Sequence, residues 1–259
     1  LTAAAYVAIL VPFKIATVIP GFTEIRPAAA IPVVFGLLFG PAAAWGAAFG
    51  NLVGDMFGGM LGPGSIPGML GNFLLAYVPY RMWRTIRGDR PADGSAAALG
   101  WTVLCAVAGA ISCAVVIATG VAAMGLVPYG ALATAITLNN GVIGTIIAAL
   151  LLPLLYPRAW KWGLVYTDIL DERDYRRTGL AATGAILTWV GCIAGALLAL
   201  ALLIAGLLRP DSPALEQLSA GMIPPLAGAV CSLLILVGTV LMSPLGGAAP
   251  QATAPEAAK

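Results

Sequence analysis

The sequence predicts an all-α membrane protein whose chain crosses the bilayer several times. Of its 259 residues, 60% are hydrophobic and only 9% are charged, and the mean hydropathy is +0.97. Soluble domains average about 25% charged residues, and a compact globule has no room to bury so large a share of apolar side chains. The apolar residues also collect into runs of roughly 20, the length at which a helix crosses the hydrocarbon core.

We expect eight spans joined by short polar or charged segments. In chain order they cover 1–19, two short spans within 28–59, and then 69–83, 96–126, 129–156, 179–208 and 222–241. The stretch LGPGSIPG before the fourth span is rich in Gly and Pro and is expected to be a loop without helix. The charged segment 161–178 is expected at or outside the membrane interface, and the tail 245–259 is expected to be disordered.

The stretch 28–59 decides the topology. As a single helix, its roughly 30 residues would measure about 45 Å, much more than the hydrocarbon core. Gly40-Pro41 offers a turn between two shorter helices. Two spans place the loop of Glu24 and Arg26 outside, whereas one long kinked helix would place Arg26 inside. Length and charge both favour two spans.

The basic residues gather in two clusters, each between apolar runs. The clusters are Arg81, Arg84, Arg87 and Arg90, and then Arg158, Lys161, Arg173, Arg176 and Arg177. Short loops rich in Lys and Arg stay in the cytoplasm, so both clusters are expected there. A nucleic-acid partner is not expected, because no basic domain studded with aromatic residues accompanies them.

The reactive side chains argue against an enzyme. The chain has no histidine, which excludes Ser-His and Cys-His hydrolases and HExxH zinc sites. Its four cysteines lie in apolar segments without a CxxC pair, as expected of small core residues. It has no Walker A sequence, so it cannot itself energise transport with ATP. We expect no enzyme activity, no metal and no cofactor.

Asn51 and Asp55 stand one helical turn apart in the apolar stretch AAFGNLVGDMFGG. A carboxylate in a membrane helix costs several kcal/mol unless it has a partner, and it is a candidate functional residue by default. Glycines recur at every fourth position from Gly46 to Gly58, a pattern that lets a neighbouring helix come into backbone contact. The pair is adjacent to this ridge, so it is expected to face a packed interface. It either binds a ligand or forms a structural pair.

Other polar residues are candidates for the same site. They are Lys14, Glu24, Arg26, Asn72, Tyr77, Asn139 and Asn140. The doubled asparagine offers amide donors and acceptors within an apolar helix, although interhelical hydrogen bonding would also account for it. Lys14 either extends toward the interface or meets an acidic partner such as Asp55 or Glu24. Glu24 and Arg26 are ligand-binding or, as loop residues, solvated or paired with each other.

Four segments resemble a known family when they are taken together in order. They are AAAYVAI, EIRPAAAIPVVFGLLFGP, AWGAAFGNLVGDMFGG and GNFLLAYVPYRMW. Their order resembles the substrate-binding (S) components of energy-coupling factor transporters, above all the group of queuosine-precursor transporters. The likeness covers about residues 1–160. It implies a six-helix bundle in a prokaryotic plasma membrane that binds a vitamin or related micronutrient near its outer face.

The resemblance also implies partners. In that family a transmembrane coupling subunit and two cytoplasmic ATPases drive transport, and an Ala-xxx-Ala face of the first helix docks on the coupling subunit. This implicates Ala4 and Ala8. The loop between the first two helices, here 20–27, gates the pocket.

The last third of the chain departs from the family pattern. Residues 179–244 add two further apolar spans, which could occlude the coupling face or bind another partner. The sequence therefore predicts the substrate-capture subunit of an uptake transporter. The mixed amide, acid and amine groups favour a heterocyclic ligand. The alternative is a structural or assembly subunit of a larger membrane complex that keeps an S-component-like fold.

Overall fold

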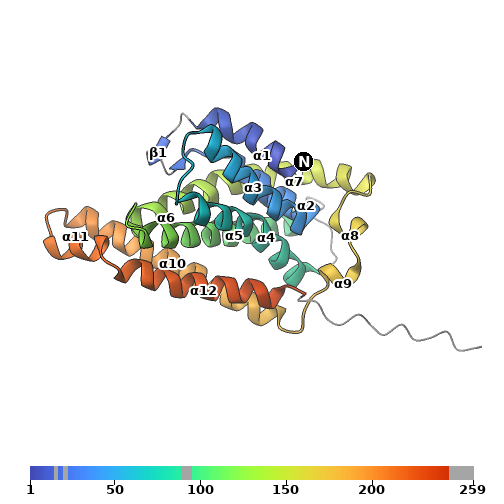
Figure 1. The fold of residues 1–259 in the computed structure, drawn as a ribbon. Helices are drawn as coiled ribbons and strands as arrows, with labels where there is room; N and C mark the ends of the chain where they lie inside the picture. The colour runs from blue at the N-terminus through green and yellow to red at the C-terminus, as the bar shows by residue number, and fades with distance from the viewer. Residues whose placement is uncertain (15–16, 20–22, 89–94, 245–259) are drawn as a thin grey trace, which may run out of the picture.

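The computed structural model describes residues 1–14, 17–19, 23–88 and 95–244. Its main helices, in chain order, are α1 (Thr2–Leu10), α2 (Ala30–Phe39), α3 (Pro41–Phe57), α4 (Ser65–Arg87), α5 (Ala96–Ala123), α6 (Tyr129–Leu138), α7 (Thr145–Lys161), α10 (Ala181–Leu208) and α12 (Ile223–Met242). The helices lie side by side, with α1 at one edge of the bundle and α10 and α12 at the opposite edge (Figure 1). The predicted all-α fold is confirmed.

Shorter elements connect these helices. They are the 3₁₀ turns η1 (Val11–Phe13) and η2 (Pro27–Ala29), the strands β1 (Thr17–Ile19) and β2 (Thr23–Glu24), the π-helical segment η3 (Asn139–Gly144), and the helices α8 (Tyr166–Ile169), α9 (Glu172–Tyr175) and α11 (Pro213–Ala220). The two strands pair antiparallel, with Thr17 opposite Glu24.

Four segments are long and apolar enough to cross a membrane. They are Ala96–Ala123, Tyr129–Ile169, Ala181–Leu208 and Ile223–Met242. The first three main helices have at most 17 residues, and α4 carries three arginines. Eight spans therefore remain a prediction for this chain, while the multi-pass membrane character is clear.

The first helix is shorter than the predicted span 1–19. It ends at Leu10 and is followed by one 3₁₀ turn to Phe13, and the strand β1 begins at Thr17. Pro12 explains the change, because it lacks an N–H to continue the α-helical ladder and its ring crowds the preceding turn.

The predicted turn at Gly40-Pro41 is confirmed. Gly40 has φ +59°, and α2 ends and α3 begins on either side of it. A residue with a Cβ rarely adopts this conformation, and Pro41 is placed where a helix start needs no N–H donor. The stretch 28–59 is therefore two helices.

The expected loop LGPGSIPG is partly helical, contrary to the prediction. Helix α4 begins at Ser65, so Ile66, Pro67 and Gly68 lie in its first turn. Pro67 is tolerated because the first N–H groups of a helix have no partner within it. The helix also continues to Arg87, beyond the predicted end at Trp83.

The predicted contact along the glycine ridge of α3 is confirmed, and the neighbour is α1. A Cβ at Gly46 would lie 2.7 Å from Cβ of Thr2, and one at Gly54 would lie 2.4 Å from Cδ2 of Leu10. Gly46, Gly50 and Gly54 thus meet α1, while Gly58 meets Lys14 just beyond it. This close approach holds α1 against the face of α3 next to Asn51 and Asp55.

The C-terminal helices α10 and α12 pack against each other and against α4, α5 and α6. At one end of the hairpin, buried Arg81 of α4 donates from Nε to the carbonyl of Met242 at 2.8 Å. Its two terminal nitrogens donate to the carbonyls of Tyr175 and Arg176, at 3.3 and 3.1 Å. The first arginine cluster therefore holds the charged segment and the end of α12 on the bundle. The predicted tail 245–259 lies outside the described residues.

Candidate binding site

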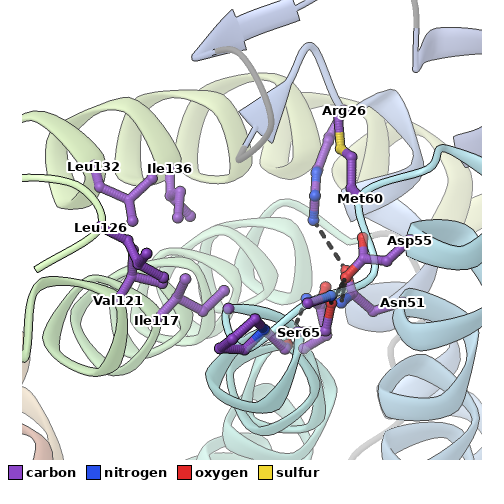
Figure 2. Close-up of a pocket in the computed structure, with 15 residues that line it drawn as sticks. Arg26, Asn51, Asp55, Met60, Ser65, Ile117, Val121, Leu126, Leu132 and Ile136 are labelled. Atoms are coloured by element: carbon purple, nitrogen blue, oxygen red, sulfur yellow. Dashed lines mark hydrogen bonds between the residues drawn. The ribbon is translucent and has the colours of Figure 1, made fainter. Parts of the chain in front are cut away.

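A cavity of about 180 Å³ lies where the first turns of α4 face α5 and α6 (Figure 2). Its polar lining residues are Arg26, Asn51, Asp55, Ser65 and Asn72. Its apolar lining comes chiefly from Met60, Ile117, Val121, Leu126, Leu132 and Ile136. Figure 2 shows the polar groups on one side of the cavity and the aliphatic groups of α5 and α6 on the other.

A chain of hydrogen bonds forms the polar wall. Nη1 of Arg26 donates to Oδ1 of Asn51 at 3.2 Å, and Nδ2 of Asn51 donates to Oδ2 of Asp55 at 3.2 Å. The hydroxyl of Ser65 donates to the same Oδ2 at 2.9 Å. All four residues are at least nine-tenths buried. The wall therefore presents a guanidinium, an amide, a carboxylate and a hydroxyl that hold one another in place.

Lys14 forms an ion pair with the carboxylate of Asp55. Its Nζ lies 3.2 Å from Oδ1 of Asp55, and both side chains are at most 10% exposed. The ammonium also lies 3.5 Å from the sulfur of Met60. The two oxygens of Asp55 thus have separate roles, because Oδ1 pairs with Lys14 and Oδ2 accepts from Asn51 and Ser65. The expected acidic partner of Lys14 is found.

The first turns of α4 supply the floor of the cavity. Nδ2 of Asn72 donates to the carbonyl of Gly68 at 2.9 Å, and Oδ1 accepts from the hydroxyl of Tyr6 at 2.8 Å. Tyr6 and Asn72 are both almost fully buried. This bond joins α1 to α4 beneath the cavity.

The doubled asparagine lies in η3 and supports the site from outside the cavity. Oδ1 of Asn139 accepts from the backbone N–H of Arg26 at 3.1 Å, so it fixes the residue that begins the polar wall. Nδ2 of Asn140 lies 3.6 Å from the sulfur of Cys113. Neither asparagine is among the residues that line the cavity. A π-helical turn within an α-helix often marks a functional site.

Two predicted residues lie elsewhere or are not described. Tyr77 donates to the hydroxyl of Ser243 at 2.9 Å, near the end of α12, and does not line the cavity. Tyr77 lies more than a helical turn beyond Asn72 on α4, toward the arginine cluster. The backbone of Glu24 pairs in the strand ladder, but its side chain lies outside the described residues.

Ala4 and Ala8 lie on the exposed face of α1. The opposite face of the helix carries Tyr6 and Leu10, which are fully buried. Because α10 and α12 lie across the bundle from α1 (Figure 1), the hairpin does not cover this alanine face.

Besides the aliphatic lining, the sequence interpretation missed two polar residues of the site. Ser65 was expected to lie in a turn, yet it is the residue that links the start of α4 to Asp55. The sequence carries no signal for this contact, because it joins a hydroxyl in the first turn of α4 to a side chain of α3. Tyr6 carries no signal either, because an aromatic residue in an apolar helix usually packs in the core.

The site is built for recognition by hydrogen bonds. Arg26 and Lys14 contribute two positive charges and Asp55 one negative charge, while the opposite wall is purely aliphatic. Among the described residues, no three His, Cys, Asp or Glu side chains gather as a metal site requires. A flat ligand could bind with its polar edge against Asn51 and Ser65 and its face against Ile117.

Comparison with known families decides the identity. A family model described as QueT transporter matches residues 1–157, well over half of the chain. The chain belongs to the QueT transporter family. Comparison with curated proteins and with solved structures found no match.

The QueT family is the queuosine-precursor-transporter-like group of S components, so the resemblance seen in the sequence is confirmed. The protein is a transporter component of the membrane. The match includes every residue of the cavity and ends within α7. The hairpin of α10 and α12 therefore lies beyond the part of the chain that carries the family pattern.

Proposed function

We propose that this protein is the substrate-capture subunit of an energy-coupling factor uptake transporter and binds a compact heterocyclic micronutrient. The observation that carries the proposal is the cavity with one hydrogen-bonding wall and one aliphatic wall, built from residues of the family-matched region. Amide, hydroxyl and guanidinium groups suit the ring nitrogens and exocyclic groups of a heterocycle. An aliphatic wall suits its face.

The size of the cavity supports a small ligand. Its volume of about 180 Å³ is below the roughly 300–1,000 Å³ typical of sites for drug-sized molecules. One or two fused rings are therefore favoured over a large cofactor. The group to which the family belongs makes a queuosine-precursor base the first compound to test.

The ends of the helices support an outward-facing cavity. Ser65 and Asn72 lie near the N-terminal end of α4, whereas Arg84 and Arg87 lie in its last turn. Basic loops stay in the cytoplasm, so the opposite end of α4 and the cavity face the outside of the plasma membrane.

The exposed alanine face of α1 supports docking on a transmembrane coupling subunit, with ATPases on the cytoplasmic side. Ala4 and Ala8 leave a surface of small side chains, which lets another membrane helix approach closely. The hairpin lies across the bundle from this face, so the chain's own extension is compatible with docking.

Equilibrium binding to the purified full chain tests the proposal. We expect saturable binding of a queuosine-precursor base, with weaker competition by thiamine and biotin. Asn51→Ala is expected to reduce affinity, and Gln217→Ala serves as a control because Gln217 is an exposed amide on α11 that does not line the cavity. If no heterocycle binds and the protein purifies with large unrelated membrane partners, the structural-subunit alternative replaces the proposal.

A further inference from the structure

The helices α5 and α6 lie between the cavity and the C-terminal hairpin. On α5, Ile117 and Val121 line the cavity, while Val115 and Thr119 contact the hairpin. Positions 117 and 119 are about 200° apart around a helix of 3.6 residues per turn. The aliphatic wall of the cavity therefore has the hairpin directly behind it.

The contacts between this wall and the hairpin are close. A Cβ at Gly195 of α10 would lie 2.6 Å from Cγ2 of Val115, and one at Gly228 of α12 would lie 2.5 Å from Oγ1 of Thr119. On α6, a Cβ at Gly130 would lie 2.9 Å from Cβ of Leu202. Glycine at each crossing removes the side chain that would otherwise separate the helices.

Hydrogen bonds fix the same contact. The hydroxyl of Tyr129 on α6 donates to the carbonyl of Gly195 at 3.1 Å, and Tyr129 is fully buried. The hydroxyl of Ser232 donates to that of Thr119 at 3.2 Å. Such bonds between membrane helices stabilise their contact, and here they act where glycines already bring the backbones together.

We propose that the C-terminal hairpin positions the aliphatic wall of the binding cavity and thereby sets the affinity for the ligand. The hairpin holds α5 and α6 fixed, so the ligand meets a rigid wall on that side. The polar wall is held by other elements, since α1 packs on the glycine ridge of α3 and Lys14 pairs with Asp55. The residues of the crossing are positioning residues, because they do not line the cavity.

The effect on ligand affinity rests on the proposed function, but the effect of the hairpin on the position of α5 can be tested without a ligand. The main variant is Gly195→Ala, whose methyl would displace the wall at Val115. The matched control is Gly206→Ala on the same helix, where a Cβ would meet nothing within 4 Å. Tyr129→Phe is a milder variant, because it removes only the bond to Gly195 and keeps the ring.

Two readouts are taken on the full chain. Hydrogen exchange over residues 113–121 is expected to rise in Gly195→Ala and Tyr129→Phe but not in Gly206→Ala. Affinity for the queuosine-precursor base that binds the unaltered chain is expected to fall about tenfold in Gly195→Ala, a change equal to the loss of one or two buried methylene contacts. Val115→Ala in the Gly195→Ala background is expected to restore both readouts, because it makes room for the added methyl.

The outcomes separate the two proposals. If the hairpin only stabilises the fold, Gly195→Ala lowers the melting temperature while affinity and exchange over 113–121 match the Gly206→Ala control, and the inference is overturned. If the unaltered chain binds none of the bases, the proposed function fails, and the exchange data still decide whether the hairpin holds the wall.

Discussion

The ammonium of Lys14 lies 3.2 Å from Oδ1 of Asp55, so the segment after the first helix is paired with a carboxylate 41 positions later in α3. Both side chains are almost completely buried. Removing one partner of a buried pair leaves an uncompensated charge, which costs more than the pair itself contributes. The pair thus explains how an apolar helix can carry a carboxylate at the edge of the cavity.

Replacing Asp55 by Asn is expected to weaken ligand binding without preventing membrane insertion. The amide removes the charge that pairs with Lys14, and the polar wall loses its organising acceptor. We expect an affinity loss of about tenfold or more, because the wall loses the carboxylate oxygen that accepts from both Asn51 and Ser65. Ligand titration of the purified variant measures the loss. Unchanged affinity would assign Asp55 a structural role only.

Replacing Ser65 by Ala is expected to have a smaller effect of the same kind. The variant removes one neutral donor to Asp55, and a bond to a charged group contributes about 1.5–3 kcal/mol. Ser219→Ala in α11 is a suitable control, since that hydroxyl contacts only the nearby carbonyl of Glu216. Equal affinities for the two variants would show that Ser65 does not shape the site.

Replacing both Ala4 and Ala8 by Leu is expected to break association with a coupling subunit and to leave ligand binding intact. The two leucines would add bulk to a surface whose small side chains permit close helix contact. Ala194→Leu with Ala201→Leu places the same bulk on exposed positions of α10 and should have no effect. Co-purification with the coupling subunit is the measurement, and its survival in the Ala4 and Ala8 variant would place the docking face elsewhere.

Replacing Arg81 by Lys is expected to lower the melting temperature of the protein. A lysine keeps the positive charge but cannot reproduce the fork that reaches the carbonyls of Met242, Tyr175 and Arg176. The loss of two charged hydrogen bonds corresponds to about 3–6 kcal/mol before relaxation. Limited proteolysis between α9 and α10 should accelerate in parallel. Unaltered cleavage would show that the clamp does not hold this segment.

Much of the fold could be predicted because membrane helices differ from other segments in composition and in the length of their apolar runs. The turn at Gly40 and the helix contact along Gly46 to Gly58 could be predicted, since each sequence pattern has one dominant structural role. The start of α4 could not be predicted, because a proline such as Pro67 interrupts a helix in most positions and is tolerated in the first turn only. Whether Pro67 interrupts or is tolerated therefore depends on where the helix begins, which the sequence does not settle.

The candidate site was predicted in part for a similar reason. Asn51, Asp55 and Asn72 were identifiable because polar groups in apolar helices need partners. Tyr77 looked equivalent to Asn72, yet five positions along a helix carry it past the cavity. Ile117 and Leu132 were not predictable, because an aliphatic residue that lines a cavity has the same sequence signature as one that faces lipid.

Helix α4 carries both the first lining residues of the cavity and the Arg81 clamp. Its 23 residues span about 35 Å at 1.5 Å per residue, with Ser65 at one end and the clamp toward the other. Ser65 lies about 24 Å from Arg81 along this helix, so a tilt of about 5° around the clamp would move the start of α4 by roughly 2 Å. A small rotation at the clamped end would therefore change the width of a cavity of this size.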